Sequence, residues 1–370
     1  MSSSLVTRSA EQPIRTPNGD RGRQPLWRAV ARWEAGLVVV LIGVLIFGSV
    51  KSSSFTDAST LFYFGINTGY VAIMALPMTF VVMTGEIDLS VASMLGLSGA
   101  TVGILWHHGW GIWPAFGVAL LVGLVGGALN GLLVARFGLP SIAVTIGTLT
   151  LFRGLAEVLL KSLTIPTIGD RQFPGWFTDI GANSIPGTQL SWSTVIFLAL
   201  AVVFGVVLHA TALGRRMVAI GLQPEAARFA GVRVNRIKFW LFVLSGFLSA
   251  FAGILLTIQN ASVSYDAGTG LELTVVAIVL FGGVSIFGGR GTILGVVLSV
   301  IIVGSLQMVL TQINVSADKQ NIVTGVLLLI SVIVPNGGEA LRRVRDAVRR
   351  RAVPRQRDIS THSSEGRATP

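Results

Sequence analysis

Residues 214–238 read GRRMVAIGLQPEAARFAGVRVNRIK, a basic segment between two long apolar runs. Neither residues 180–214 on one side nor residues 239–265 on the other contain Asp, Glu, Lys or Arg. About 20 helical residues span the roughly 30 Å hydrocarbon core of a bilayer, so each flank is long enough to cross it. The pattern predicts two transmembrane helices joined by a short polar connection.

Charge places this basic segment on the cytoplasmic side of the membrane. It carries six Lys and Arg residues and one acidic residue, Glu225, and short basic loops stay inside the cell. Within it, Glu225-Ala226-Ala227 is followed by Gly231. This spacing is typical of a short amphipathic helix that ends at Gly and lies along the membrane surface. The helix is either a docking surface for a cytoplasmic partner or a solvated connector.

The composition is that of a protein that lies mostly in lipid. Of its 370 residues, 52% are hydrophobic and only 12% are charged, whereas a soluble domain has about 25% charged residues. The 44 glycines suit closely packed membrane helices. The net charge of +11 would suggest nucleic acid in a soluble protein, but here it is concentrated in segments predicted to be cytoplasmic. We therefore predict no nucleic-acid partner.

Hydropathy divides the chain into an all-α polytopic integral membrane domain between two basic tails. We predict a disordered cytoplasmic tail at 1–34, the membrane domain at 35–335 and a cytoplasmic tail at 336–370. About ten transmembrane helices are expected, at 35–50, 61–83, 89–106, 115–135, 141–160, 193–213, 239–258, 273–287, 292–313 and 321–335.

The basic residues orient this layout. Of the 28 Lys and Arg residues, 23 lie on segments predicted to be inside and four on segments predicted to be outside. Both termini are therefore predicted to be cytoplasmic. The longest outer loop, 161–191, contains three prolines. It is either a docking surface for an external partner or a plain connector.

The chain lacks the motifs of common hydrolases. It has no G-x-x-x-x-G-K-[ST] phosphate loop, no H-E-x-x-H and no G-x-S-x-G. The adjacent His107 and His108 have no predicted third ligand, and there is no cysteine, so no metal site is expected. We predict that the protein is not an enzyme, has no catalytic residues and needs no cofactor.

Polar residues within the membrane domain are candidates for function. Asp88 precedes a predicted span and either caps that helix or contacts a substrate. Asn130 and Thr148 lie within predicted spans, where they form interhelical hydrogen bonds or line a polar path. Arg153 and Glu157 are four residues apart on one helix face and are predicted to neutralise each other. This pair is either structural or part of the same path.

Four segments along the chain together carry a family pattern. GEIDLSVAS at 85–93 is similar to GGIDLSVGS, from which Glu86 and Ala92 depart. The others are Asn130-Gly131 with Pro140 and TIGT at 145–148, Arg153-Gly154, and LFGGVSIFGGRGT at 280–292. Over residues 60–335 they resemble the membrane-spanning permease of bacterial sugar-type ABC importers, the group of the ribose, galactose, xylose and rhamnose importers.

The same resemblance assigns a role to the basic segment. Gly214, Glu225, Ala226, Ala227 and Gly231 resemble the coupling loop of such permeases, with its E-A-A-x-x-x-G pattern. The I-x-L-P ending of the wider pattern is absent. The resemblance implies docking into a cytoplasmic ABC ATPase, together with an extracytoplasmic solute-binding protein and a second permease subunit, identical or different.

The resemblance implies import of a small neutral sugar or sugar-like solute across the bacterial plasma membrane. ALPMTFV at 75–81 and FGGVSIFGG at 281–289 are most similar to the autoinducer-2 and rhamnose importer permeases. The alternative is a stand-alone secondary transporter or channel for a small polar solute. Such a protein needs ionisable residues near the midplane of the membrane, and Arg153 and Glu157 are the candidates.

Overall fold

The computed structural model describes residues 26–57, 59–161, 164–166 and 171–333, whose regular elements are helices. They are α1 (Leu26–Lys51), η1 (Ser53–Thr56), α2 (Thr60–Met83), α3 (Val91–His107), α4 (Ile112–Gly131), η2 (Leu132–Arg136), α5 (Ser141–Leu160), α6 (Gly175–Ala182), α7 (Trp192–Ala210), α8 (Ala212–Leu222), α9 (Pro224–Phe229), α10 (Val234–Asn260), α11 (Leu271–Phe281) and α12 (Ile293–Gln312). A further helical segment, 317–333, continues to the last described residue. The all-α class predicted from the sequence is confirmed for this part of the chain.

Seven of the described helices are long and apolar enough to cross a membrane. They are α1, α2, α4 with η2, α5, α7, α10 and α12. Every predicted span contains a helix, but α3, α11 and the segment 317–333 are shorter than the other seven. A multi-pass membrane protein is therefore confirmed, whereas ten crossings remain a prediction.

The predicted tails lie mostly outside the described residues. Residues 1–25 and the whole of 336–370 fall there. Residues 26–34, which we predicted to be disordered, are instead helical, because α1 begins at Leu26. The predicted disorder of residues 26–34 is therefore wrong, whereas the start of the membrane domain at residue 35 stays a prediction.

Tertiary contacts account for the helical structure at this boundary. Trp33 Nε1 donates a hydrogen bond to the carbonyl oxygen of Phe281 (3.1 Å). The carboxylate of Glu34 accepts one from the Thr292 hydroxyl (2.7 Å). Both partners are distant in the sequence, so local composition gave no sign that these residues would be ordered.

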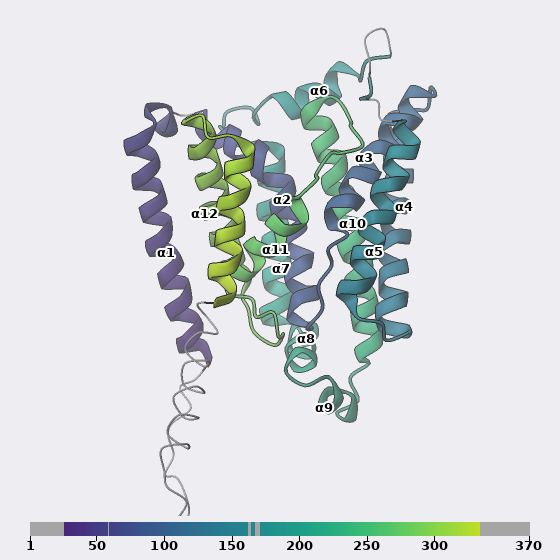
Figure 1. Cartoon of the computed structure of the whole chain (residues 1–370), viewed down its shortest axis with the longest axis vertical. Coiled ribbons are helices and arrows are strands. Elements are labelled where there is room, and N and C mark those ends of the chain that lie inside the picture. Colours follow the sequence, from purple (N-terminus) through teal and green to yellow (C-terminus); the bar gives the residue numbers. More distant parts are fainter. Residues whose placement is uncertain (1–25, 58, 162–163, 167–170, 334–370) are drawn as a thin grey trace, which may run out of the picture.

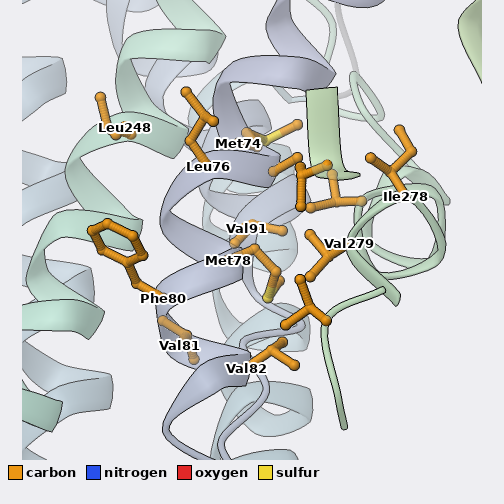
Figure 2. Close-up of a cluster of buried hydrophobic side chains, with 14 of the residues drawn as sticks. Met74, Leu76, Met78, Phe80, Val81, Val82, Val91, Leu248, Ile278 and Val279 are labelled. Atoms are coloured by element: carbon orange, nitrogen blue, oxygen red, sulfur yellow. The ribbon is translucent and has the colours of Figure 1, made fainter. Parts of the chain in front are cut away.

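The helices α2 and α10 form the centre of the bundle (Figure 1). In the apolar stretch of α2, 83% of the residues are buried, against 11% in that of α1, which lies at the periphery. Figure 2 shows side chains of α2, among them Met74 and Met78, beside Ile278 and Val279 of α11, with Leu248 of α10 nearby. The core is therefore organised around α2.

Glycines bring α4 against α10. Gly123 and Gly127 lie one turn apart on α4. A Cβ at Gly123 would lie 2.6 Å from the carbonyl oxygen of Gly246, and one at Gly127 would lie 2.5 Å from that of Phe242. Small residues at such spacing let membrane helices approach through their backbones. The packing role expected for the glycines is confirmed at this pair of helices.

Two of the predicted spans are short helices that each follow a non-helical segment, and we call these two the broken spans. The span expected at 89–106 is α3, preceded by the non-helical residues 84–90. The span expected at 273–287 is α11, preceded by the non-helical residues 261–270 and ending at Phe281. At 1.5 Å per residue, 11 helical residues cover only about 16 Å. The prediction of a helix through residue 287 is therefore wrong, because Gly282 and Gly283 form a turn there.

The N-terminal ends of these two short helices meet inside the bundle. A Cβ at Gly268, just before α11, would lie 3.2 Å from the carbonyl oxygen of Ala92 in the first turn of α3. Irregular backbone at membrane depth is tolerated where protein buries it or where it lines a cavity. Discontinuous helices of this kind form solute sites in many transporters. Residues 84–90 and 261–270 are therefore candidates for a solute site.

Candidate functional site

The basic segment folds as two short helices, α8 and α9, at the end of the bundle opposite α6 (Figure 1). The Thr211 side chain caps α8 by accepting hydrogen bonds from the backbone N–H groups of Leu213 (3.2 Å) and Gly214 (3.4 Å). Gly214 packs against the carbonyl of Leu208 so closely that a Cβ would clash. Its lack of a side chain therefore sets the sharp bend from α7 into α8.

The helix α9 contains three of the predicted coupling residues. Glu225 lies in its first turn, where an acid is favourable, and Ala226 is exposed. Ala227 is buried in a small cluster with residues of α8 and α10. Gly231 follows with a φ of 81°, a value that glycine adopts without strain. The short helix ended by glycine has the predicted form, and α8 is a second helix that the pattern did not predict.

An exposed aromatic side chain projects from α9. Phe229 is 92% exposed at the tip of this segment. The sequence analysis did not single it out, although a Phe within a basic loop predicted to be cytoplasmic was a visible signal. Aromatic residues exposed in this way are common anchors of protein interfaces.

Three backbone segments meet where α8 ends. The N–H of Gly289 donates to the carbonyl of Met83 at the end of α2 (2.8 Å). Gly221 lies against both, and a Cβ there would come closer than 3.0 Å to the Met83 oxygen and the Gly289 nitrogen. We call the contact of Gly221, Met83 and Gly289 the glycine junction. It connects α8 directly to the segments that flank α2 and α11.

An ion pair adds a second connection on the same side. Lys238, near the start of α10, pairs with Glu86 of the non-helical segment 84–90. Both side chains are largely buried, at 15% and 16% exposure, so the pair is screened less than a surface pair. Glu86 departs from the family pattern, and it pairs with a basic residue of the segment 214–238.

Asp88 is buried within a polar network. Its Oδ1 accepts hydrogen bonds from the N–H (3.0 Å) and hydroxyl (2.6 Å) of Ser90, and its Oδ2 accepts one from Ser245 of α10 (2.8 Å). Asn130 of α4 donates to the Ser90 hydroxyl (2.8 Å). These bonds offset the cost of burying a carboxylate. They favour the structural interpretation of Asp88 and Asn130, which together hold residues 84–90 between α4 and α10.

The first turns of α5 also contact residues 84–90. The N–H of Ile87 donates to the Ser141 hydroxyl (3.2 Å), and the Thr145 hydroxyl donates to the Ile87 carbonyl (3.3 Å). The Thr145 hydroxyl is closer to the Ser141 carbonyl of its own helix (2.8 Å), so the N–H is the group of Ile87 that is firmly satisfied. Thr148 is buried one turn further along and donates to the carbonyl of Val144 (3.2 Å). It is thus engaged within its own helix.

Arg153 contacts the second non-helical segment. Its Nη1 donates to the carbonyl oxygens of Tyr265 (3.1 Å) and Ala267 (2.8 Å). Asp266 lies between these two residues, and Glu272 follows in the first turn of α11. Glu157, the partner predicted from the sequence, is exposed one turn further along α5. Sequence reasoning missed Asp266 and Glu272, because both fell in a predicted outer loop.

Comparison with known proteins identifies a family for this chain. A family model described as a branched-chain amino acid transport system permease component matches residues 60–332, the greater part of the chain. The chain belongs to this family. The matched region contains both broken spans, the glycine junction and the segment α8–α9. No solved structure matches the chain.

Individual relatives narrow the assignment to ABC importers. The chain is 32% identical to the autoinducer 2 import system permease protein LsrD of Klebsiella pneumoniae, over 86% of this chain and 94% of the relative. It is 32% identical to the L-arabinose ABC transporter permease protein AraH of Azospirillum brasilense, over 88% and 95%. It is also 32% identical to the ribose import permease protein RbsC of Haemophilus influenzae, over 81% and 91%.

These relatives confirm the family predicted from the sequence motifs. The chain is the membrane permease subunit of an ABC importer and resides in the bacterial inner membrane. Family membership implies an ATPase and a solute-binding protein as partners. The relatives do not support the alternative of a stand-alone secondary transporter or channel.

Proposed function

We propose that this permease imports a small neutral sugar and that α8–α9 is its docking element for the cytoplasmic ATPase. The sugar class follows from the relatives, since LsrD, AraH and RbsC are named for autoinducer 2, L-arabinose and ribose. A second permease subunit completes the path, and the solute-binding protein docks at the α6 end. The chain supplies a path with two conformations, while ATP hydrolysis takes place on the partner.

The docking assignment rests mainly on the exposed Phe229. An aromatic side chain with 92% exposure has its apolar surface in water unless a partner covers it. The same two helices carry exposed basic residues, including Arg215, Arg216 and Arg228. An apolar anchor with a charged rim is the usual anatomy of a protein interface.

Two connections would transmit a movement of the docked ATPase to the broken spans. The glycine junction joins α8 to the end of α2 and to the loop after α11. The pair of Glu86 and Lys238 joins the start of α10 to residues 84–90. A displacement of α8–α9 would therefore be transmitted to residues 84–90 and to the loop after α11, and such rigid-body coupling is how alternating access operates in general.

Replacing Phe229 with serine tests the docking role. We expect the ATPase to co-purify poorly with the variant, with affinity reduced about thirtyfold, because a buried aromatic anchor contributes about 2 kcal/mol or more. Uptake should fall in parallel, while folded permease accumulates normally. The matched control is Phe137→Ser, since Phe137 is also 66% exposed but lies in the α4–α5 connection. Equal effects of both variants would contradict a specific anchor.

The proposed topology predicts opposite accessibility for two exposed glutamines. Gln189 lies between α6 and α7, and Gln223 lies between α8 and α9. In intact cells, a membrane-impermeant thiol reagent should label Gln189→Cys and not Gln223→Cys. The chain contains no native cysteine, so background labelling is absent. Labelling of Gln223→Cys alone would show the reverse orientation.

A further inference from the structure

A polar cavity lies beside the second broken span. Its volume is about 480 Å³, and it is bounded by α2, α3, α10 and residues 261–270. Small-molecule sites commonly measure about 300–1,000 Å³. The polar side chains that line it are those of Tyr70, Thr257, Asn260, Ser262, Ser264, Asp266 and Thr269. Most belong to the segment that replaces the missing half of the α11 span.

Some of these side chains have unused hydrogen-bonding capacity. The hydroxyls of Thr257 and Ser262 donate to backbone carbonyls (2.9 and 3.2 Å), and that of Ser264 donates to Oδ1 of Asp266. In the described part of the chain, by contrast, the half-buried Tyr70 hydroxyl and the exposed Asn260 side-chain amide form no hydrogen bond within the protein. A bound polar solute would supply one.

The charges around the cavity select among solutes. Asp266 is the acidic residue in its lining, and none of the described residues that line it is a cation. A carboxylate accepts hydrogen bonds from hydroxyl groups and repels anions. The carboxylate of an amino acid would also lack a cationic partner here. The lining therefore suits a neutral molecule with several hydroxyl groups.

The wall that carries Asp266 is fixed from two sides. Behind it, Arg153 binds the carbonyls on either side of Asp266 (3.1 and 2.8 Å). Earlier in the same segment, Val263 exchanges two backbone hydrogen bonds with Ile165 (2.9 and 2.8 Å). Ile165 belongs to the long loop that precedes α6, so this loop is joined to the cavity wall. An ordered wall holds its polar groups in place for binding.

The geometry points to this cavity as the solute-binding site of the subunit, with Asp266 and Asn260 as residues that determine specificity. The inference rests on the proposed function, since it takes sugar import as given and identifies where the permease contacts the sugar. Asp266 accepts hydrogen bonds from the hydroxyls of the sugar, and Asn260 both donates and accepts. Arg153 acts as a positioning residue that touches the wall and not the solute.

Uptake by the complete importer tests the two residues. Ribose, L-arabinose, autoinducer 2 and leucine are supplied in turn to cells that carry the importer with each permease variant. For the sugar that the wild type accumulates, we expect Asp266→Asn to raise the half-saturating concentration about tenfold to a hundredfold, because a charged hydrogen-bond acceptor is lost. Asn260→Leu should raise it about threefold to tenfold. Asp318→Asn is the matched control, since Asp318 is exposed and lies outside the cavity.

Thiol protection gives a second readout that does not depend on transport. The purified full-length permease with Asn260→Cys is treated with a thiol reagent, with and without the accumulated sugar. We expect the sugar to slow labelling of this variant and to leave Thr188→Cys, on the exposed loop after α6, unaffected. This comparison stays informative if Asp266→Asn reduces folding.

The outcomes separate this inference from the proposed function. If the wild type accumulates leucine or none of the sugars, the proposed function is wrong and the cavity assignment falls with it. If the wild type accumulates a sugar, but Asp266→Asn resembles Asp318→Asn and the sugar does not protect Asn260→Cys, the function stands and the cavity assignment is overturned. A raised half-saturating concentration together with protection establishes the site.

Discussion

Replacing Gly221 with alanine is expected to abolish most uptake by the importer. The added Cβ would come closer than 3.0 Å to the Met83 carbonyl oxygen and the Gly289 nitrogen, a separation that real Cβ atoms do not show. Those two atoms belong to backbone and are hydrogen-bonded to each other (2.8 Å), so neither can turn away as a flexible side chain would. The glycine junction must open, at a cost of about 1–3 kcal/mol or more.

The matched control for this substitution is Gly205→Ala. Gly205 also lies within a helix, α7, and an added Cβ there would have no atom within 4 Å. Alanine favours helix over glycine by about 0.8–1 kcal/mol, so this variant should fold and transport at least as well as the wild type. Uptake is measured beside the yield of folded permease. Normal transport by Gly221→Ala would show that the junction is not needed for coupling.

Arg153→Met is expected to cause a comparable loss, through stability as well as uptake. The carbonyls of Tyr265 and Ala267 would lose their donor, and the acidic residues Asp266 and Glu272 would lose the neighbouring positive charge. A hydrogen bond to a charged group contributes about 1.5–3 kcal/mol, so we expect the loss of both bonds of this partly buried side chain to cost about 3 kcal/mol. Thermal unfolding in detergent measures this change. Arg136→Met, at an exposed position after α4, is the control and should be near neutral.

Double-mutant cycles decide which acid is the principal partner of Arg153. We expect Arg153→Met to couple more strongly to Glu272→Gln than to Glu157→Gln, since Arg153 donates to residues 265 and 267 of the segment that Glu272 closely follows. Residues that interact show coupling of about 0.5–3 kcal/mol. Stronger coupling to Glu157 would instead support the pair predicted from the sequence. In that case the hydrogen bonds from Arg153 to residues 265 and 267 would contribute little to stability.

Sequence patterns predicted the candidate site unevenly. The α9 helix and its end at Gly231 were recognisable, because a glycine stop and a basic loop are local signals. Asp88 was recognised as a helix cap or a substrate contact, but its bond to Ser245, 157 positions away, was not predictable. Asp266 and Glu272 were overlooked altogether, since a polar stretch after an apolar run looks the same whether it leaves the membrane or folds back into it.

By itself the sequence determined an all-helical membrane protein, the family of its permeases and the place of the basic segment between two spans. These properties follow from hydrophobic run length, charge bias and short motifs, all of which act within a few tens of residues. Only the tertiary structure decided that two spans are broken, that Arg153 holds residues 261–270, and that Gly221, Met83 and Gly289 meet. These contacts join segments far apart in the chain, and whether non-helical backbone is stable at membrane depth depends on distant side chains that satisfy its polar groups.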